Sequence, residues 1–387
     1  MPVIPAGRPL HVGLIAAAAS WGLFWGSWAA LLPGLKDQVG ATDTQLGLAL
    51  FGIPAGALPA MVATAPLVRA LRAWTLPVVL TAFAVACALP GLATSPLTFA
   101  GALLLVGATS GAIEVALNTT TAAHEARHGV RLFNKVHAAT PLAMVLAAPA
   151  VGLARQGGAG PLPVLLVIAA LVLLSALLAV DRSGWRAPAA EPGAHRSTAP
   201  LLIAFGLLAA VVLFLENAVE QWGALHLEES LGAGPLLGSA APACYMSGLF
   251  AGRLLAQWRG DRVSGRVLLL AGGVLGAVGV GTAALSAAAG LPSVLALAGF
   301  AVAGVGLAPA LPTLLGLAGA AVDDARRPGA IAAVTTLSYL GFLVSPPVVG
   351  VLAGAWGLTT ALTAVACGGL VVAVASAVVR APAAVAR

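Results

Sequence analysis

Charged side chains are scarce in this chain of 387 residues. Lysine and arginine contribute 19 residues and aspartate and glutamate 13, so only 8% of the chain is charged, while 60% is hydrophobic. Soluble domains carry about 25% charged residues, which cover the surface that faces water. The shortage excludes a water-soluble protein of this length, and the mean hydropathy of +1.01 predicts an integral membrane protein.

Cysteine and nucleotide-binding motifs are also rare or missing. Cys87, Cys244 and Cys367 each lie within an apolar run, and their spacing predicts neither a disulfide framework nor a metal site. The sequence contains no Gly-Lys-Ser/Thr loop, so nothing predicts ATP-driven transport by this chain alone. We expect no cofactor. The net charge of +6 does not predict a nucleic-acid partner, because the location of the basic residues matters more than their total.

Long apolar stretches dominate what is present. A helix needs about 20 apolar residues to cross a bilayer, and these runs are continuous, unlike the alternating strands of a barrel. The polar stretch 181–199 predicts a cytoplasmic linker between an N-terminal six-helix bundle (1–180) and a C-terminal one (200–387). The twelve transmembrane helices are expected at about 11–34, 45–68, 75–93, 97–122, 132–154, 161–180, 200–223, 235–257, 266–288, 292–319, 329–352 and 357–380.

The basic residues predict the orientation of these helices. With the N-terminus inside, fifteen of the 19 fall on one side and only Lys36 and Arg155 on the other, while Lys135 and Arg253 fall within spans. Cytoplasmic loops carry the excess of lysine and arginine. We therefore expect a multi-pass protein of the cytoplasmic (inner) membrane with both termini in the cytoplasm.

The two halves of the sequence resemble each other. Trp28-Ala-Ala-Leu31 returns as Trp222-Gly-Ala-Leu225, and Ala116-Leu-Asn-Thr119 returns as Ala310-Leu-Pro-Thr313, both 194 residues later. An even number of spans in each half gives both the same topology, so the repeats are related by an axis along the membrane normal. The pattern predicts two pseudo-symmetric bundles that rock about a midplane site by alternating access.

The chain resembles the major facilitator superfamily, and most closely its small bacterial inner-membrane permeases of the fucose-permease-like branch. This resemblance implies a secondary transporter of a small molecule, but it does not specify the substrate. The matching stretches are Gly26-Ser-Trp-Ala29 with Pro33 and Lys36, Leu46-Gly47, Glu114-Val-Ala-Leu-Asn118, His137-Ala138, Glu216 with Trp222, Gly252-Arg253 with Asp261-Arg262, and Tyr339-Leu-Gly-Phe-Leu343 with Pro346-Pro347 and Gly350.

Two departures from the family pattern are visible. The loop that typically reads Asp-Arg-x-Gly-Arg-Arg has lost its acidic residue here and keeps Arg69 and Arg72. The seventh span of similar proteins tends to read Glu-Gly…Asp-Trp, whereas this chain reads Glu216-Asn217…Gln221-Trp222. The first departure removes the usual gate-locking charge pair of the N-terminal half.

Acidic residues within spans are the main functional candidates, because a charge in the bilayer is costly and usually faces a cavity. Glu216 and Glu220 stand one helical turn apart and can share a face, where they are candidates for proton exchange or substrate contact. For Glu220 the alternative is a solvated helix end beside Glu228 and Glu229. Glu216 is the first choice for proton coupling.

A second polar group is expected in the N-terminal half. Glu114 and Asn118 lie four residues apart in the fourth span, and His137 lies early in the fifth, where a side chain that titrates near neutrality suits a proton relay. The alternatives are a helix-end carboxylate with a structural partner for Glu114 and a helix-contact residue for His137.

Aromatic and amide side chains can complete a substrate cavity. Trp25 and Trp28 follow one helical stripe and Trp222 occupies the equivalent place in the second half, so they are candidates for stacking against substrate. Asn217 and Gln221 add polar groups to the seventh span. Tryptophan near a span end also serves as an interface anchor, which is the alternative.

Two charged motifs remain. Arg253 at the end of the eighth span, with Asp261 and Arg262 in the following loop, is expected to form a cytoplasmic gate. His124-Glu125-x-x-His128 fits the H-E-x-x-H pattern of zinc proteases, in which two histidines bind the metal and the glutamate acts as base. Its expected place in a short cytoplasmic loop, without a third ligand, argues against a metal site.

The sequence as a whole predicts a secondary active transporter rather than an enzyme. The expected partners are a small-molecule substrate, the lipid bilayer and protons, and the expected state is a monomer. Two alternatives stay open: a membrane-embedded metalloprotease built on His124, Glu125 and His128, and a transporter-like sensor without flux.

Overall fold

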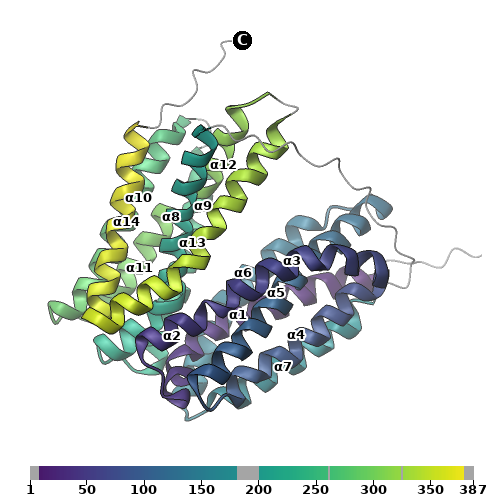
Figure 1. Ribbon diagram of the computed structural model, residues 1–387, viewed down its shortest axis with the longest axis horizontal. Coiled ribbons are helices and arrows are strands. Elements are labelled where there is room, and N and C mark those ends of the chain that lie inside the picture. The colour runs from purple at the N-terminus through teal and green to yellow at the C-terminus, as the bar shows by residue number, and fades with distance from the viewer. Residues whose placement is uncertain (1–7, 181–199, 260–261, 324–325, 379–387) are drawn as a thin grey trace, which may run out of the picture. The chain divides into compact units, whose positions relative to one another are not determined.

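The computed structural model describes residues 8–180, 200–259, 262–323 and 326–378, and these residues form helices and turns without a β-strand (Figure 1). The expected linker 181–199 lies outside the described residues. Two compact units, Met1–Ala190 and Glu191–Arg387, make up the chain. The helices of the first unit are α1 (Arg8–Val39), α2 (Asp43–Leu50), α3 (Gly52–Leu71), α4 (Thr75–Leu92), α5 (Pro96–His128), α6 (Phe133–Gln156) and α7 (Pro161–Leu178).

The second unit has the same kind of architecture. A π-helical turn at His226–Ser230 extends its first helix. The helices are α8 (Pro200–Leu225), α9 (Pro235–Arg259), α10 (Gly265–Ala288), α11 (Ser293–Leu307), α12 (Ala310–Ala320), α13 (Arg327–Trp356) and α14 (Leu358–Val378).

The helices account for the twelve predicted spans. Ten segments of the described residues are long and apolar enough to cross a membrane. One of them, Asp43–Leu92, has 50 residues and is interrupted by the 3₁₀ turn Arg72–Trp74, so it supplies two passes. Helix α9, which is more polar, adds a pass of 25 residues. The all-helical membrane fold expected from the sequence is confirmed.

Helix pairing repeats between the two units. In the first unit α1 packs along α6, α3 along α5, and α4 along α7; in the second, α8 packs along α13, α9 along α11, and α10 along α14. When α2–α3 and α11–α12 are each counted as one span, both units pair their first span with their fifth, second with fourth, and third with sixth. The structure thus reproduces the internal repeat that the sequence indicates.

Glycine brings several of these helices into direct backbone contact. A Cβ atom at Gly107 of α5 would collide with the carbonyl oxygen of Ile53 in α3. In the second unit, a Cβ at Gly304 of α11 would collide with the carbonyl oxygen of Tyr245 in α9. Small residues allow such close approach where lipid supplies no hydrophobic drive between helices.

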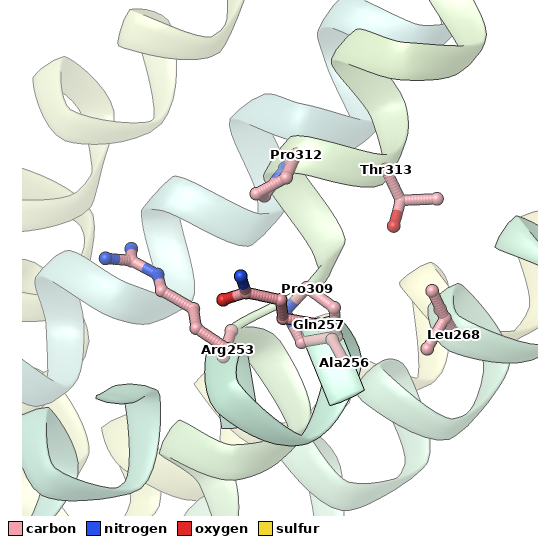
Figure 2. A pocket seen from close by; sticks show the side chains of 8 residues that line it. Arg253, Ala256, Gln257, Leu268, Pro309, Pro312 and Thr313 are labelled. Carbon is pink, nitrogen blue, oxygen red and sulfur yellow. The ribbon is translucent and has the colours of Figure 1, made fainter. Parts of the chain in front are cut away.

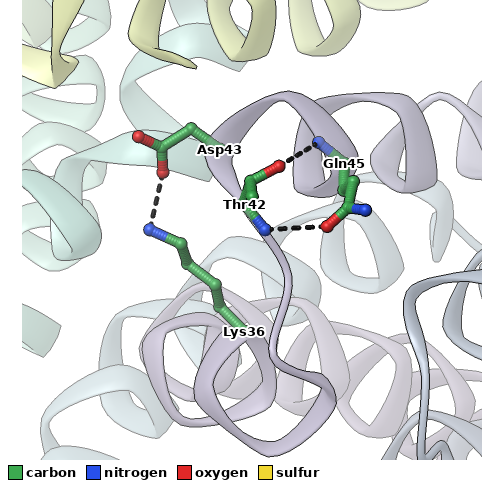
Figure 3. Close-up of polar contacts among 4 residues, drawn as sticks. All are labelled: Lys36, Thr42, Asp43 and Gln45. Carbon is green, nitrogen blue, oxygen red and sulfur yellow. Dashed lines mark hydrogen bonds and ion pairs between the residues drawn. The ribbon is translucent and has the colours of Figure 1, made fainter.

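Short polar contacts define the turn between α1 and α2 (Figure 3). Lys36 Nζ lies 2.6 Å from Asp43 Oδ1. The Gln45 backbone N–H donates to Thr42 Oγ1 at 3.2 Å and the Thr42 N–H donates to Gln45 Oε1 at 3.0 Å, a capping box that starts α2. Helix α1 continues past Pro33 to Val39, beyond the expected end at 34, because a membrane helix tolerates an internal proline.

Candidate functional site

The acidic pair of α8 lies within the second unit. Glu216 and Glu220 are one turn apart, and both side chains are partly buried. The two carboxyl groups interact electrostatically with each other. The guanidinium of Arg253, from the neighbouring helix α9, interacts electrostatically with both. The Arg253 side chain is exposed, and it acts on the expected acidic pair from the neighbouring helix, although the sequence assigned it to the cytoplasmic gate.

The expected cytoplasmic gate is represented only in part. Arg262 follows α9 as an exposed residue, and Asp261 lies outside the described residues. The grouping of Arg253 with these two residues stays a prediction. Its electrostatic relation to Glu216 and Glu220 was missed by sequence reasoning, because hydropathy does not show how α8 and α9 are rotated against each other.

Tyr245 is a second group that sequence reasoning missed. It is fully buried in α9, and among the described residues its hydroxyl has no hydrogen-bond partner. It interacts electrostatically with Glu216, Glu220 and Arg253. One feature of the sequence could have indicated it. The chain has only two tyrosines, and Tyr245 lies near the middle of a predicted span.

The amide and indole groups expected on α8 are buried. Asn217 is 6% exposed, Gln221 is 7% exposed and Trp222 is fully buried. Within the described part of the chain, Asn217 Oδ1 and Trp222 Nε1 have no hydrogen-bond partner. Buried polar atoms usually have partners, so these two are places where a water or a ligand group can bind.

Arg253 also lines an open pocket of about 400 Å³ between α9, α10 and the α11–α12 segment. Figure 2 shows its guanidinium pointing away from Leu268 and Thr313, while the Gln257 side chain lies between. The remaining lining residues are Ala256, Ala308, Pro309 and Pro312.

In the first unit the structure joins two of the expected residues. His137 Nε2 lies 2.9 Å from Asn118 Oδ1, which links α6 to α5. Glu114 lies one turn before Asn118 and is partly buried, whereas the His137 side chain is exposed. The Phe133 ring packs 4.3 Å from the His137 ring, centroid to centroid.

The aromatic candidates of α1 differ in their surroundings. Trp28 is 1% exposed and stacks with Phe24 at 5.9 Å and with Phe99 of α5 at 6.1 Å. Trp25 is partly buried and packs edge-on against Phe24. Trp28 thus contributes to helix packing within its own unit, and a substrate role for either indole stays a prediction.

The H-E-x-x-H motif lies on a helix and not in the expected loop. Helix α5 continues through His128 and ends at Gly129, whose φ of 64° suits glycine. The Glu125 carboxylate accepts hydrogen bonds from the backbone N–H groups of Leu132 and Phe133, the second at 2.6 Å, and so caps the start of α6. This capping role uses the group that a zinc protease would need as its base.

A third histidine, His11, lies beside the two histidines of the motif. The ring of His124 contacts those of His11 and His128 at centroid distances of 4.5 and 4.2 Å. Among the residues that the structure describes, no group of three or more histidine, cysteine or acidic side chains could hold a metal ion. Nothing in this region therefore supports the metalloprotease alternative.

Comparison with known proteins now identifies the family. Residues 206–386 match the family model of the Major Facilitator Superfamily. An uncharacterised MFS-type transporter of Yersinia pestis is 31% identical over 361 residues, which cover 89% of both chains. The chain belongs to the major facilitator superfamily. The family resemblance seen in the sequence is confirmed.

Further relatives agree with this assignment. Membrane protein MosC of Rhizobium meliloti is 28% identical over 366 residues, covering 92% of this chain and 86% of that protein. The nucleoside transporter NupG has the same fold, with a TM-score of 0.77, 14% identity and coverage of 95% of this chain and 98% of that one. The Escherichia coli fucose:proton symporter FucP gives 0.57 at 18% identity, with 95% and 98% covered.

Proposed function

We propose that this major facilitator protein is a proton-coupled secondary transporter that carries a small molecule across the cytoplasmic membrane by alternating access. Family membership supports membrane transport. Glu216 is the main proton-coupling or substrate-orienting carboxyl and Glu114 the second. In the same proposal the protein works as a monomer, and it is a transporter rather than an enzyme.

One observation carries the choice of Glu216. Its carboxyl is partly buried in a span, next to a second acid one turn away, and Arg253 is the charged partner that acts on both. A carboxylate in a span loses hydration unless it is protonated, paired or wet. One guanidinium carries a single positive charge for two acids, which leaves one acid to protons or to a substrate group.

FucP, which shares this fold, is a fucose:proton symporter. At 18% identity it supports proton coupling here only as a precedent of the fold.

The test starts from purified protein in proteoliposomes. A panel of sugars, nucleosides, amino acids and small aromatic compounds is screened by thermal shift, and the compound with the largest shift is used for flux. In Glu216→Gln, which mimics the protonated acid, uptake driven by a pH gradient should collapse while counterflow exchange partly remains. Glu229→Gln, an exposed acid of the turn after α8, is the matched control and should behave as wild type.

Two outcomes would change the proposal. Wild-type pH dependence in Glu216→Gln would move the coupling role to Glu114. Ligand binding without flux in any orientation of the gradient would favour the transporter-like sensor.

A further inference from the structure

Three histidines meet where α1 begins and α5 ends. His11 lies near the start of α1, and His124 and His128 are one turn apart at the end of α5. The His11 and His124 rings meet edge to face, with their centroids 4.5 Å apart. The His124 and His128 rings are 4.2 Å apart, with 31° between their planes. The three rings form one row that joins two helices which are not consecutive in the chain.

The nitrogen atoms of this row differ in how well they can carry a proton. His128 Nδ1 lies 3.1 Å from the His124 carbonyl oxygen, and because a carbonyl only accepts, Nδ1 donates and the lone pair of the neutral ring is on Nε2. His11 Nε2 is buried and has no hydrogen-bond partner among the described residues. A charged imidazole carries an N–H on both nitrogens, so a proton on His11 would leave a buried donor without an acceptor. We expect the first proton on His128 Nε2.

The middle ring is the most deeply buried of the three. His124 is 4% exposed, whereas His11 and His128 are half-buried. A charge on any ring lies within 4.2–4.5 Å of the next ring centroid. Like charges this close repel strongly where water is largely excluded. The row can therefore hold one proton with its rings in contact, but not two on neighbouring rings.

One acid lies beside the row, and it is already engaged. The Glu125 carboxylate accepts hydrogen bonds from the backbone N–H groups of Leu132 and Phe133. It also interacts electrostatically with Arg131 and with His124. A single carboxylate shared in this way does not balance several charged imidazoles.

The other charged groups at this end of the unit are basic or neutral. Among the described helices, α1 packs against α4, α5, α6 and α7, and α5 also packs against α2, α3, α4 and α6. The titratable and charged side chains of these elements and their turns at the same end are Arg69, Arg72, Arg127, Arg131, Lys135 and His137. Those nearer the middle or the opposite end are Lys36, Asp37, Asp43, Cys87, Glu114 and Arg155.

The sign of the pH effect follows from proton counting. In the unfolded chain each histidine binds a proton freely below its ordinary value of about 6.5. The folded row binds fewer protons, so its contribution to stability is complete above that value and is lost as the pH falls through it.

We propose that His11, His124 and His128 form a pH-sensitive latch, which holds the start of α1 against the end of α5 near neutral pH and releases it in acid. N–H bonds form on the rings, the rings separate, and no other bond changes. On the expected topology this end of the unit faces the cytoplasm, so the latch responds to cytoplasmic acidification. It goes beyond the proposed transport and does not depend on it, because Glu216 and Glu114 are not part of the row.

The first test compares unfolding midpoints without a substrate. Purified full-length protein in detergent is heated at about pH 7.5 and at about pH 5.5, one unit either side of the ordinary histidine value. The wild-type midpoint should fall by several degrees in acid. His124→Phe keeps a ring between His11 and His128 but takes no proton, so its fall should be at most about half as large.

His137→Phe is the matched control. His137 is an exposed histidine of α6 outside the row, and its ring bonds to Asn118. The variant should have a lower midpoint at both pH values, because that hydrogen bond is lost, and should keep the wild-type fall between them. A purely structural role of the row would likewise leave the fall unchanged in His124→Phe.

The second test locates the release. Hydrogen exchange is followed by mass spectrometry at both pH values, with labelling times scaled for the pH dependence of intrinsic exchange. In wild type the peptides 11–20 and 120–128 should lose protection at least about threefold in acid, because the two helix ends open locally. The peptide 103–111, which packs against α3, should not change, and in His124→Phe all three peptides should stay protected.

The outcomes separate the latch from folding and from transport. If His124→Phe does not fold, His128→Phe removes the expected site of the first proton and should also reduce the fall. Equal falls in wild type and in the folded variant, or unchanged exchange at both helix ends, overturn the latch. Flux that is independent of protons, with the latch responding as described, leaves the latch standing and refutes only the proposed coupling.

Discussion

Asn118 Oδ1 lies 2.9 Å from His137 Nε2, and this contact joins α5 to α6. The amide oxygen only accepts, so the imidazole Nε2 donates and carries its proton in this arrangement. Both neutral and charged imidazole can provide that N–H. The bond therefore holds the His137 ring in one orientation without requiring a charge.

The first prediction concerns the strength of this contact. A double-mutant cycle of Asn118→Ala and His137→Ala, followed by thermal unfolding in detergent, should give a coupling of about 0.5–1.5 kcal/mol, the usual net value for one hydrogen bond. The exposed Asn134 of α6 supplies the control. Asn134→Ala should be additive with Asn118→Ala, and additivity of the main pair as well would mean that the contact does not form in solution.

The second prediction concerns Glu125. Glu125→Ala removes the acceptor for two backbone N–H groups at the start of α6 and should lower the unfolding midpoint. Glu125→Gln keeps an acceptor oxygen and should lose less. The readout is the unfolding midpoint of each purified variant.

The same protein preparation tests the zinc alternative. Zinc measured by inductively coupled plasma mass spectrometry should be well below one per chain, and a chelator should not move the unfolding midpoint. A full equivalent of zinc that disappears in His124→Ala would instead establish a metal site at the motif.

The third prediction uses two glycines of one helix. Gly107→Ala places a methyl group against the Ile53 carbonyl of α3 and should cost about 1–3 kcal/mol, as overpacking does. Gly101→Ala meets no atom within 4 Å and should be neutral or stabilise α5. Detergent-solubilised yield and unfolding midpoint measure both. Equal losses in the two variants would mean that the α3–α5 backbone contact is not close.

The fourth prediction is topological. Reporter fusions at both termini and after residue 190 should be cytoplasmic, because fifteen of the 19 basic residues fall on one side of the expected spans. An epitope inserted at Gly40, which has no neighbouring atom within 4 Å of a Cβ, should be external. An external reporter at 190 would break the model of two halves with equal topology.

Most of the fold was accessible from the sequence, because a bilayer forces each span to be a long apolar run. The ends of the helices were harder to predict. Helix α5 continues through His124, Glu125 and His128, where polar residues extend it beyond the apolar run. Once a helix leaves the hydrocarbon, hydropathy no longer marks where it stops.

For the candidate site, the sequence could predict only which residues lie close together on the same helix. Spacing of four residues placed Glu216 with Glu220 and Glu114 with Asn118, since neighbours on one helix face follow from its period. Contacts between helices depend on rotation and close packing. For that reason the relation of Arg253 and Tyr245 to the acids of α8 emerged only from the structure.

The pairing of α1 with α6 has a consequence for biosynthesis. α1 ends at Val39 and α6 begins at Phe133, so α1 leaves the ribosome long before the helix that packs along it. With a mean hydropathy of 1.4 over its candidate span, it is also the least apolar of the ten membrane-capable segments among the described residues. During translation α1 is therefore made before the helix that covers its packed face.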